Sequence, residues 1–557
     1  MRSRVTVSFI VLALMAVACG GAPAASPGAS AAPGASAPAS QAASAEPPAS
    51  AAPVADTLQM HWLGDCTCIW HPAAYETFSQ AINFEMMFST LIDRGWEGDS
   101  WTPIPDLADS WEISPDGLVW TFYLHPGVLW HDGTPFTASD IEFTINRSMI
   151  TPLRFTRAAW DALVGAKEAA DGTADKVAGV RVIDDLTIEL TLGEANADYF
   201  SDLADPNSVI VPRHILEPTD PKEVETIEFS TTAPIGTGPY KFIKYETDQY
   251  SQFEANPDYF RGVPKIKNIF VKRLLGDLAI AQLESGDLDL SVRLNPAEKS
   301  RLEQVPTLDV ISTPGVGTFG PYFNMLLMTD VNTRKAIAYA VNAQGIVDNV
   351  FGAAGRVNRG VVPGMPPADD QEYFDYDPVK AKELLDSSSW DKNQPLRIVF
   401  DKSFAAVEQW VPIFAQDLEA IGFKTELIGL ESTAAIEFYN KIDQWEVIIA
   451  QGGDQGVGPF RTQNYYNCDQ VEPAVNKAYL KDCKIDELFL QARREVDDAA
   501  RTEIFKQISK ITNLAVDRIS YWTTNALSAK AKGLEGVNIP PNTREFIVGV
   551  QYWTFTK

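Results

Sequence analysis

Histidine and cysteine are scarce in this chain of 557 residues, which contains five of each. The histidines are His61, His71, His125, His131 and His214, and none belongs to the His-Glu-x-x-His motif of zinc hydrolases. The sequence also lacks the Gly-x-Ser-x-Gly turn of serine hydrolases and the glycine-rich loop that holds nucleotide phosphates. We therefore expect no catalytic site, no metal site and no cofactor, with a secreted hydrolase as an alternative.

Basic residues are also few. The chain has 46 Lys and Arg against 74 Asp and Glu, a formal net charge of −28. Proteins that bind nucleic acid present a basic surface to the phosphates, so this balance argues against a nucleic-acid partner.

Long apolar runs are absent except at the start of the chain. Val5 to Ala18 is an apolar stretch of 14 residues that follows Arg2 and Arg4. A membrane-spanning helix needs about 20 such residues, whereas a basic start and a shorter apolar run are typical of an export signal. We expect residues 1–18 to be a signal peptide and the protein to be exported.

The signal is followed by Ala16-Val17-Ala18-Cys19-Gly20, which resembles the lipobox of bacterial lipoproteins, although Ala16 stands where leucine is usual. The resemblance implies that Cys19 becomes the N-terminus and carries acyl chains, so that a lipid holds the protein on the outer face of the cell membrane. An ordinary cleaved signal is the alternative. Residues 20–55 are mostly Ala, Pro, Ser and Gly, with Glu46 as the one charge. This composition predicts a disordered tether that reaches about 30 Å.

Four cysteines remain after Cys19, namely Cys66, Cys68, Cys468 and Cys483. An even number in an exported protein indicates disulfides. We favour a Cys468–Cys483 bridge, which closes a short loop. A strained Cys66–Cys68 ring, cross-pairing between the two groups and a zinc site stay open as alternatives.

The globular body runs from Asp56 to Lys557 and alternates strand and helix patterns, which predicts an α/β fold. Leu118–Gly127 alternates apolar and polar residues like a strand. A helix is expected from Ala138 to Arg147, capped by Ser139 or the residue before it. Lys484–Val516 repeats apolar residues at helical spacing and reads as two long helices, and strand-like sequence follows.

Six segments, in order, resemble the family 5 extracellular solute-binding proteins of ABC importers, a group that contains dipeptide, oligopeptide, nickel and some oligosaccharide binders. The segments are Leu124–Gly133 with the adjoining Thr134–Ile141, Ile235–Tyr240, Ala281–Asp289, Asn324 with Asn332–Ala340, Tyr376–Leu385 and Leu418–Phe423. We interpret their glycines and prolines, and His131 in the Trp-His-Asp-Gly stretch, as structural.

The resemblance implies a two-lobed periplasmic-binding-protein type II fold of the three-domain kind, with the ligand in a cleft between the lobes. Lobe I would comprise 56–101, 220–314 and 523–557, the additional domain 102–219, and lobe II 315–522. The hinge would lie near Gly315–Gly320 and Ser520–Asn525. Gly315–Gly320 also spells Gly-x-Gly-x-x-Gly, but a dinucleotide-binding fingerprint must open a helix, and the residues that follow look extended. We interpret it as a strand that allows close backbone approach.

The resemblance also suggests ligand-binding residues. Peptide-binding members pair an aspartate with the α-ammonium of the ligand, and Asp454 occupies the matching place after the apolar strand Trp445–Ala450. A turn aspartate is the alternative. Other candidates share a place next to the expected cleft or an aromatic ring: Asn83, Glu85, Met86, Phe319, Tyr322, Asn324, Trp410 and Trp522.

From these observations we expect a monomeric, lipid-anchored receptor that captures di- or oligopeptides and delivers them to the membrane permease of an ABC importer. An oligosaccharide ligand comes second, because the chain is rich in tryptophan, and nickel comes third. A surface lipoprotein that docks other proteins is an alternative of another class.

Overall fold

A computed structural model describes most of the globular body. The described residues are 55–61, 70–72, 78–97, 100–151, 158–247, 249–274, 277–315, 317–360, 364–402, 405–452, 459–466, 468, 478, 480–540 and 546–556. The chain divides into the units Met1–Ala51 and Ala52–Lys557, and everything below concerns the second unit. The predictions for the signal peptide, Cys19, Cys66, Cys68 and Asp454 lie outside the described residues.

The first sheet gathers strands from distant parts of the chain, in the order β12-β19-β11-β1-β10-β9-β8. Its strands are β1 (Thr57–His61), β8 (Tyr240–Glu246), β9 (Tyr250–Ala255), β10 (Asn268–Lys272), β11 (Leu290–Leu294), β12 (Leu308–Thr313) and β19 (Ala526–Ala531). The strand β1 lies parallel to both β10 and β11, and the other neighbours are antiparallel. Leu58 and Met60 alternate with less buried residues on β1 and enter one of the main cores.

The second sheet has the order β14-β18-β13-β17-β15-β16. Its strands are β13 (Thr318–Phe323), β14 (Gly355–Val357), β15 (Pro395–Asp401), β16 (Lys424–Leu430), β17 (Val447–Gly452) and β18 (Trp522–Thr524). The strand β15 is parallel to β16 and β17, whereas β13 is antiparallel to β17. All residues of β13 are buried, as expected for a strand covered on both faces.

A third, antiparallel sheet has the order β4-β5-β7-β6. It consists of β4 (Ala108–Ile113), β5 (Val119–Leu124), β6 (Val180–Asp184) and β7 (Thr187–Thr191). Two hairpin-like pairs complete the strands: β2 (Ile92–Glu97) with β3 (Ser100–Pro105), and β20 (Leu534–Glu535) with β21 (Thr554–Phe555).

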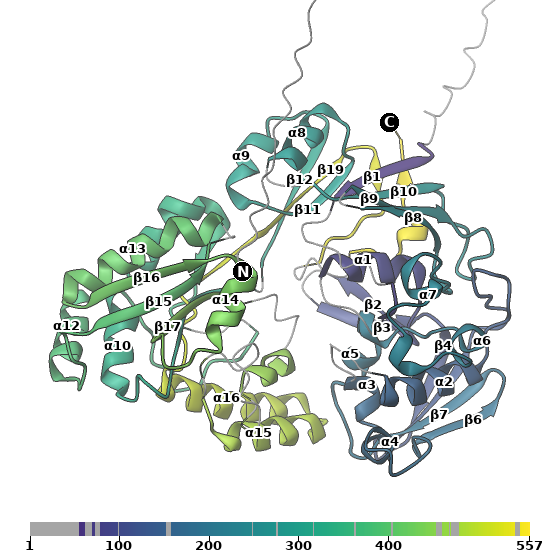
Figure 1. Cartoon of the computed structure of the whole chain (residues 1–557), viewed down its shortest axis with the longest axis horizontal. Helices are drawn as coiled ribbons and strands as arrows, with labels where there is room; N and C mark the ends of the chain where they lie inside the picture. Colours follow the sequence, from purple (N-terminus) through teal and green to yellow (C-terminus); the bar gives the residue numbers. More distant parts are fainter. Residues whose placement is uncertain are drawn as a thin grey trace, which may run out of the picture. The chain divides into compact units, whose positions relative to one another are not determined.

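Helices cover these sheets, and Figure 1 shows α10, α12 and α13 packed around the sheet that holds β15–β17. The α-helices are α1 (Phe78–Met87), α2 (Ala138–Ile150), α3 (Ala158–Asp161), α4 (Ala166–Ala170), α5 (Tyr199–Leu203), α6 (Arg213–Leu216), α7 (Glu228–Thr231), α8 (Leu278–Ser285), α9 (Lys299–Leu302), α10 (Val331–Ala340), α11 (Ala343–Ile346), α12 (Pro378–Ser387), α13 (Ala405–Ile421), α14 (Ser432–Tyr439), α15 (Cys483–Arg494) and α16 (Asp498–Ala515). Each of the three larger sheets has its own buried hydrophobic cluster.

The local predictions agree well with these elements. The predicted strand is β5, and the two long helices near the end of the chain are α15 and α16. The predicted helix cap was wrong: α2 is capped by Thr137, not by Ser139 or Ala138. The Thr137 N–H donates to the Asp140 carboxylate at 2.9 Å, so the residues three apart form a capping box.

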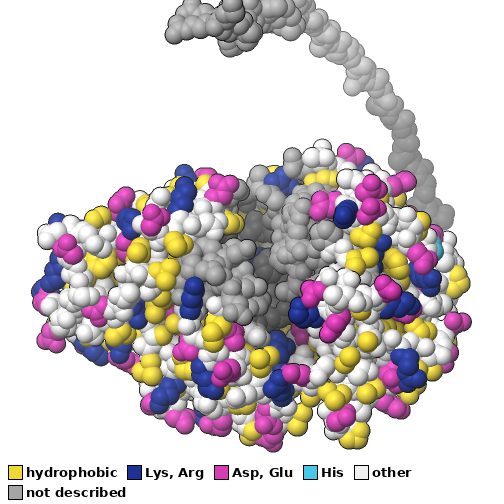
Figure 2. Space-filling model, turned by 60° about the horizontal axis from the view of Figure 1, so that its bottom comes forward, with side chains coloured by type: hydrophobic (Ala, Val, Ile, Leu, Met, Phe, Trp, Pro, Cys, Tyr) yellow, Lys and Arg dark blue, Asp and Glu magenta, His cyan; other side chains and the backbone are white. Residues whose placement is uncertain are grey.

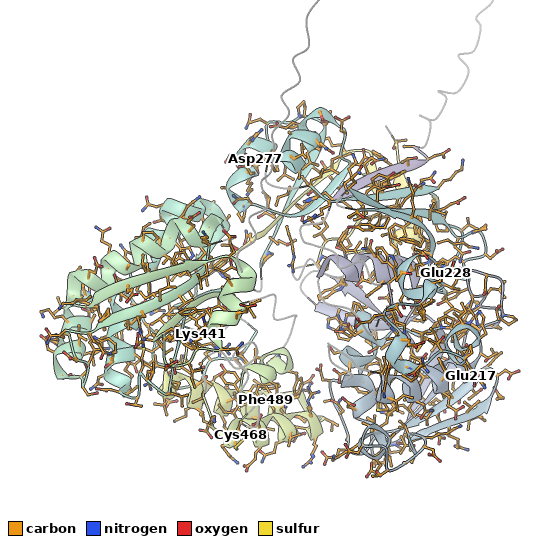
Figure 3. The ribbon with its side chains drawn as sticks, in the orientation of Figure 1. Glu217, Glu228, Asp277, Lys441, Cys468 and Phe489 are labelled. Carbon is orange, nitrogen blue, oxygen red and sulfur yellow. A yellow bond between two sulfur atoms is a disulfide. The ribbon has the colours of Figure 1, made fainter. Side chains whose placement is uncertain are left out.

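A disulfide joins Cys468 and Cys483, which confirms the favoured pair. Cys483 is the first residue of α15, and the Cys468 N–H donates to the Asp486 carboxylate on the same helix at 2.8 Å. Figure 3 shows Cys468 beside α15 and α16, close to the buried ring of Phe489. The bridge therefore fastens Cys468 to the start of a helix that is packed in a hydrophobic cluster.

The described surface is mixed in character. On the face drawn in Figure 2, acidic, basic and apolar side chains are interspersed, without a broad basic area. Among the described residues, no helix combines the length and apolar character required to cross a membrane.

Removal of the disulfide should destabilise the body. The two cysteines are 15 positions apart, and opening a loop of this size costs about 3 kcal/mol in the chain-entropy account. The variant with Cys468→Ser and Cys483→Ser should unfold at a lower urea concentration than the parent protein. Dithiothreitol should shift the parent but leave the double variant unchanged, and an equal shift in both proteins would contradict the assignment.

Candidate functional site

Parallel strands of the second sheet end together at one edge. The carboxyl ends of β15, β16 and β17 lie at Asp401, Leu430 and Gly452, and β13 begins beside Gly452 at Thr318. Ligands of open α/β sheets bind outside the carboxyl ends of the strands. Lys402 directly follows β15 and Glu431 directly follows β16 at this edge. The Lys402 ammonium nitrogen lies 3.3 Å from the Glu431 carboxylate.

The first sheet has an equivalent edge, where β1, β10 and β11 run parallel and end at His61, Lys272 and Leu294. The His61 imidazole is buried and uses both nitrogens, with Nδ1 2.9 Å from the Ser291 hydroxyl and Nε2 3.1 Å from the Leu274 carbonyl oxygen. Burial lowers the pKa of His61 to about 4, so the ring is neutral at pH 7. This histidine fastens the end of β1 to its neighbours.

The chain passes between the two sheets at two places, from β12 to β13 and from β18 to β19. The two crossing segments touch. A Cβ atom on Gly315 would lie 1.9 Å from the Thr524 carbonyl oxygen, so only glycine fits there. The Asn525 amide donates to the Ser312 hydroxyl at 3.0 Å, and its backbone N–H donates to the Ala354 carbonyl at 2.7 Å.

The Gly-x-Gly-x-x-Gly sequence ends in β13, which is a strand and not a helix. The motif therefore lacks the helix N-terminus that holds a pyrophosphate, and its glycines permit backbone contact at the crossing. This agrees with the interpretation made from the sequence.

Two of the motifs found in the sequence pack directly on each other. His131 Nδ1 accepts the Gly236 N–H at 3.2 Å, and its Nε2–H donates to the Gly238 carbonyl at 3.0 Å. A Cβ on Gly236 would lie 1.8 Å from the Met87 carbonyl oxygen, so the glycines let this segment lie against the end of α1. His131 is buried and neutral, because burial lowers its pKa to about 4. The motifs thus form a structural contact, as expected from the sequence.

Comparison with known proteins identifies the family of this chain. The family described as bacterial extracellular solute-binding proteins, family 5, matches residues 102–473. This chain belongs to that family. A dipeptide-binding protein of Pseudomonas aeruginosa is 26% identical over 505 residues, which cover 86% of this chain and 92% of that protein.

Solved structures share the two-lobed type II fold. The oligopeptide-binding protein AppA of Bacillus subtilis, in complex with a nonapeptide, aligns with a TM-score of 0.76 and 20% identity, covering 91% of this chain and all of AppA. NikZ of Campylobacter jejuni, in complex with Ni(L-His), aligns with a TM-score of 0.73 and 22% identity over 90% of this chain and 99% of NikZ. The predicted α/β fold is confirmed. These family 5 folds hold chemically different ligands.

The predicted ligand residues on α1 are mostly enclosed in this family 5 protein. Asn83 and Met86 are buried, and Met86 belongs to the core beneath the first sheet. Glu85 lines a cavity of about 50 Å³ together with Asp106 and Arg261. The Asp106 carboxylate accepts the Thr90 N–H at 2.9 Å and lies 3.3 Å from the Arg261 guanidinium. Burial raises the pKa of Asp106 to about 7.

Three of the four aromatic candidates, Phe319, Trp410 and Trp522, are packed together. The ring centroids of Trp410 and Trp522 are 4.8 Å apart, and Phe319 stacks on Trp522 at 6.2 Å. Both tryptophans have no exposed surface and belong to the core of the second sheet. In this structure they offer no ring face to a ligand. The sequence could not reveal this, because it shows how many tryptophans exist and not how they pack.

Tyr322 and Asn324 follow on β13 and just after it. Tyr322 is buried against the cluster that contains Trp445, with the Arg518 guanidinium 5.8 Å from its ring. The Asn324 amide donates to the Ile442 and Trp445 carbonyls at 2.8 and 2.9 Å, and its oxygen accepts the Leu326 N–H. Asn324 thus joins β13 to the start of β17.

Asp454 follows the end of β17 by two residues in the sequence and lies outside the described residues. The ligand-binding roles of all nine candidate residues stay predictions. The Lys402–Glu431 pair at the same edge was missed. Both charges directly follow strands, but the sequence carries no clear signal for the pair, because β15 ends in the charged Asp401 and β16 contains Lys424 and Glu426.

Gly315→Ala should destabilise the protein, because the new methyl group must push the Thr524 carbonyl away. Overpacking of this kind costs about 1–3 kcal/mol. Gly193→Ala is a suitable control, since a Cβ there would lie 3.7 Å from its nearest neighbour, the Ala162 carbonyl oxygen. Urea denaturation should separate the two variants, and equal stability would show that the crossing tolerates a side chain.

His131 should make the stability depend on pH. The pKa of His131 is near 6.5 in the unfolded chain and about 4 in the folded protein. Between these pH values the unfolded state binds a proton on His131 and the folded state does not. As the pH falls from 6.5 to 4, this residue should reduce the free energy of unfolding by roughly 3 kcal/mol. His131→Gln should lose this component in urea titrations at pH 7, 5.5 and 4.5. An unchanged pH dependence would mean that His131 has the same pKa in the folded and unfolded states, which would contradict this prediction.

Proposed function

We propose that this family 5 solute-binding protein captures di- or oligopeptides and delivers them to the permease of an ABC importer. The observation that carries the proposal is the pair of parallel-strand edges, one in each sheet, joined by two touching crossing segments. Such an arrangement suits a cleft that closes on a solute by bending at the crossings. The division into lobe I, lobe II and an additional domain is part of this proposal.

Peptide is the preferred solute class. The Pseudomonas aeruginosa relative is named a dipeptide-binding protein and the Bacillus subtilis neighbour holds a nonapeptide, which favours a peptide here. Asp454, two residues beyond the end of β17, would then pair with the α-ammonium group of the peptide. In a closed, desolvated cleft a carboxylate and an ammonium attract each other strongly.

The other solute classes have less support. The aromatic candidates for stacking on a sugar are enclosed in the core, which weakens the argument for an oligosaccharide. For nickel, the described residues contain no group of three or more His, Cys, Asp or Glu side chains that could hold an ion. The protein itself would perform no chemistry, and the permease complex would hydrolyse ATP.

Attachment to the membrane completes the proposal. Lipid on Cys19 would keep the monomeric receptor beside its permease, and the tether of residues 20–55 would let it turn and dock. The Cys19 motif and the composition of the tether support this step.

Binding should be tested first on the purified body, residues 56–557, with a library of di- to nonapeptides and a matched set of oligosaccharides. We expect peptides to raise the melting temperature and sugars to leave it unchanged. Stabilisation by an oligosaccharide alone would overturn the peptide proposal.

Asp454→Ala should then weaken peptide binding by about 30- to 1000-fold, because the α-ammonium group would be buried without its partner. Asp391→Ala is the matched control. Asp391 is an exposed aspartate that precedes β15 in the chain, and its carboxylate accepts the Asn393 N–H in a turn. Isothermal titration calorimetry should show the loss only for Asp454. Equal affinities would remove Asp454 from the site.

A further inference from the structure

The strand β14 forms one edge of the second sheet, and among the described strands it pairs with β18 alone. In an antiparallel ladder, alternate residues direct their backbone groups to the partner strand. Asn525 donates to the Ala354 carbonyl and Asn358 donates to the Tyr521 carbonyl. The same alternation directs the groups of Arg356 to β18 and those of Gly355 and Val357 outward.

The edge of β14 that faces away from β18 is continued by one backbone hydrogen bond, just beyond the end of the strand. The Phe374 N–H donates to the Arg359 carbonyl at 3.0 Å, so the segment before α12 lies alongside this edge. Closer to β14 this pairing stops. Within the part of the chain that the structure describes, the Val357 N–H and carbonyl have no hydrogen-bond partner.

A hollow of about 500 Å³ lies at this place. Its walls include Gly355, Val357, Asn342 and Tyr376. Tyr376 is half-exposed and forms part of the wall. The hollow is large enough for a few residues of an extended chain, and unpaired edge strands commonly bind such segments.

Two arginines line the hollow, and they differ in their surroundings. The Arg359 guanidinium binds both oxygens of Asp375, with Nε 2.6 Å from Oδ1. Arg356 is exposed and makes no ion pair or hydrogen bond with its side chain among the described residues. A cation that has no described counterion and lies beside an open strand edge is suited to an incoming carboxylate.

We propose that the edge of β14 is a docking surface for an extended, acidic segment of the importer's permease. The segment would add to the sheet through Val357 and place a Glu or Asp side chain against Arg356. The identity of the partner rests on the proposed function, whereas the chemistry of the surface rests on β14, the hollow and Arg356. The solute would bind elsewhere, at the carboxyl ends of β15–β17.

The surface chemistry can be tested on the full body with two blocked peptides, acetyl-Thr-Val-Glu-Val-Thr-amide and its lysine counterpart. Blocked ends remove the α-ammonium group that the solute site is proposed to need. The glutamate peptide should slow deuterium exchange at Val357 and bind at least tenfold more tightly than the lysine peptide. Equal binding of both peptides would overturn the role of Arg356.

Two variants separate the charge from the strand edge. Arg356→Gln should reduce glutamate-peptide affinity about tenfold, and Val357→Pro should abolish it by removing the outward N–H. Arg181→Gln is the control, because Arg181 is an exposed strand arginine of the third sheet. If Val357→Pro fails to fold, Arg356→Gln, a mild surface change, still decides the test. Unaltered affinity in Arg356→Gln would refute the proposal.

The permease is tested by uptake in cells. Arg356→Glu should reduce uptake of the identified peptide solute at least tenfold while the purified variant keeps its solute affinity. Normal uptake by this variant would refute docking at β14. A parent protein that binds no peptide solute would instead refute the proposed function, so the two failures are distinguishable.

Discussion

The contact between the two crossing segments is the constraint on which the arrangement of the sheets depends. The backbone at Gly315 lies against the Thr524 carbonyl so closely that no Cβ fits. Each sheet takes strands from both sides of this contact, because β12 and β19 belong to one sheet and β13 and β18 to the other. The chain therefore connects the two sheets twice, from β12 to β13 and from β18 to β19. Any movement of one sheet relative to the other must bend these two short segments. In the proposed function, closing on a solute would bend these two segments.

The most recognisable motifs of the chain serve this scaffold. His131, Gly236 and Gly238 join a loop of the third sheet to the end of α1, and the His131 ring is buried and neutral. Such a contact depends on hydrogen bonds with fixed partners and on space for backbone, and it is independent of the solute. The motifs therefore identify the family strongly and say nothing about the cargo, which agrees with the different ligands held by AppA and NikZ.

Predictions succeeded where the signal was local. The helices α15 and α16 followed from apolar residues three and four positions apart, and the Cys468–Cys483 bridge followed from a short loop and an even cysteine count. The cap of α2 was wrong, although Thr137 and Asp140 form a capping box that the sequence contains. The strand β14 could not be predicted, since three residues carry no periodic pattern and its pairing is decided by β18.

The sequence by itself indicated the family, the α/β character, the helices α2, α15 and α16 and the favoured disulfide, because each depends on residues near one another or on motifs of fixed spacing. Only the tertiary structure decided which side chains remain available for binding. Trp410 and Trp522 pack against each other in the core, whereas Arg356 stays exposed beside an unpaired edge. Burial is set by contacts between segments more than a hundred residues apart, and the free edge exists because the sheet ends at β14.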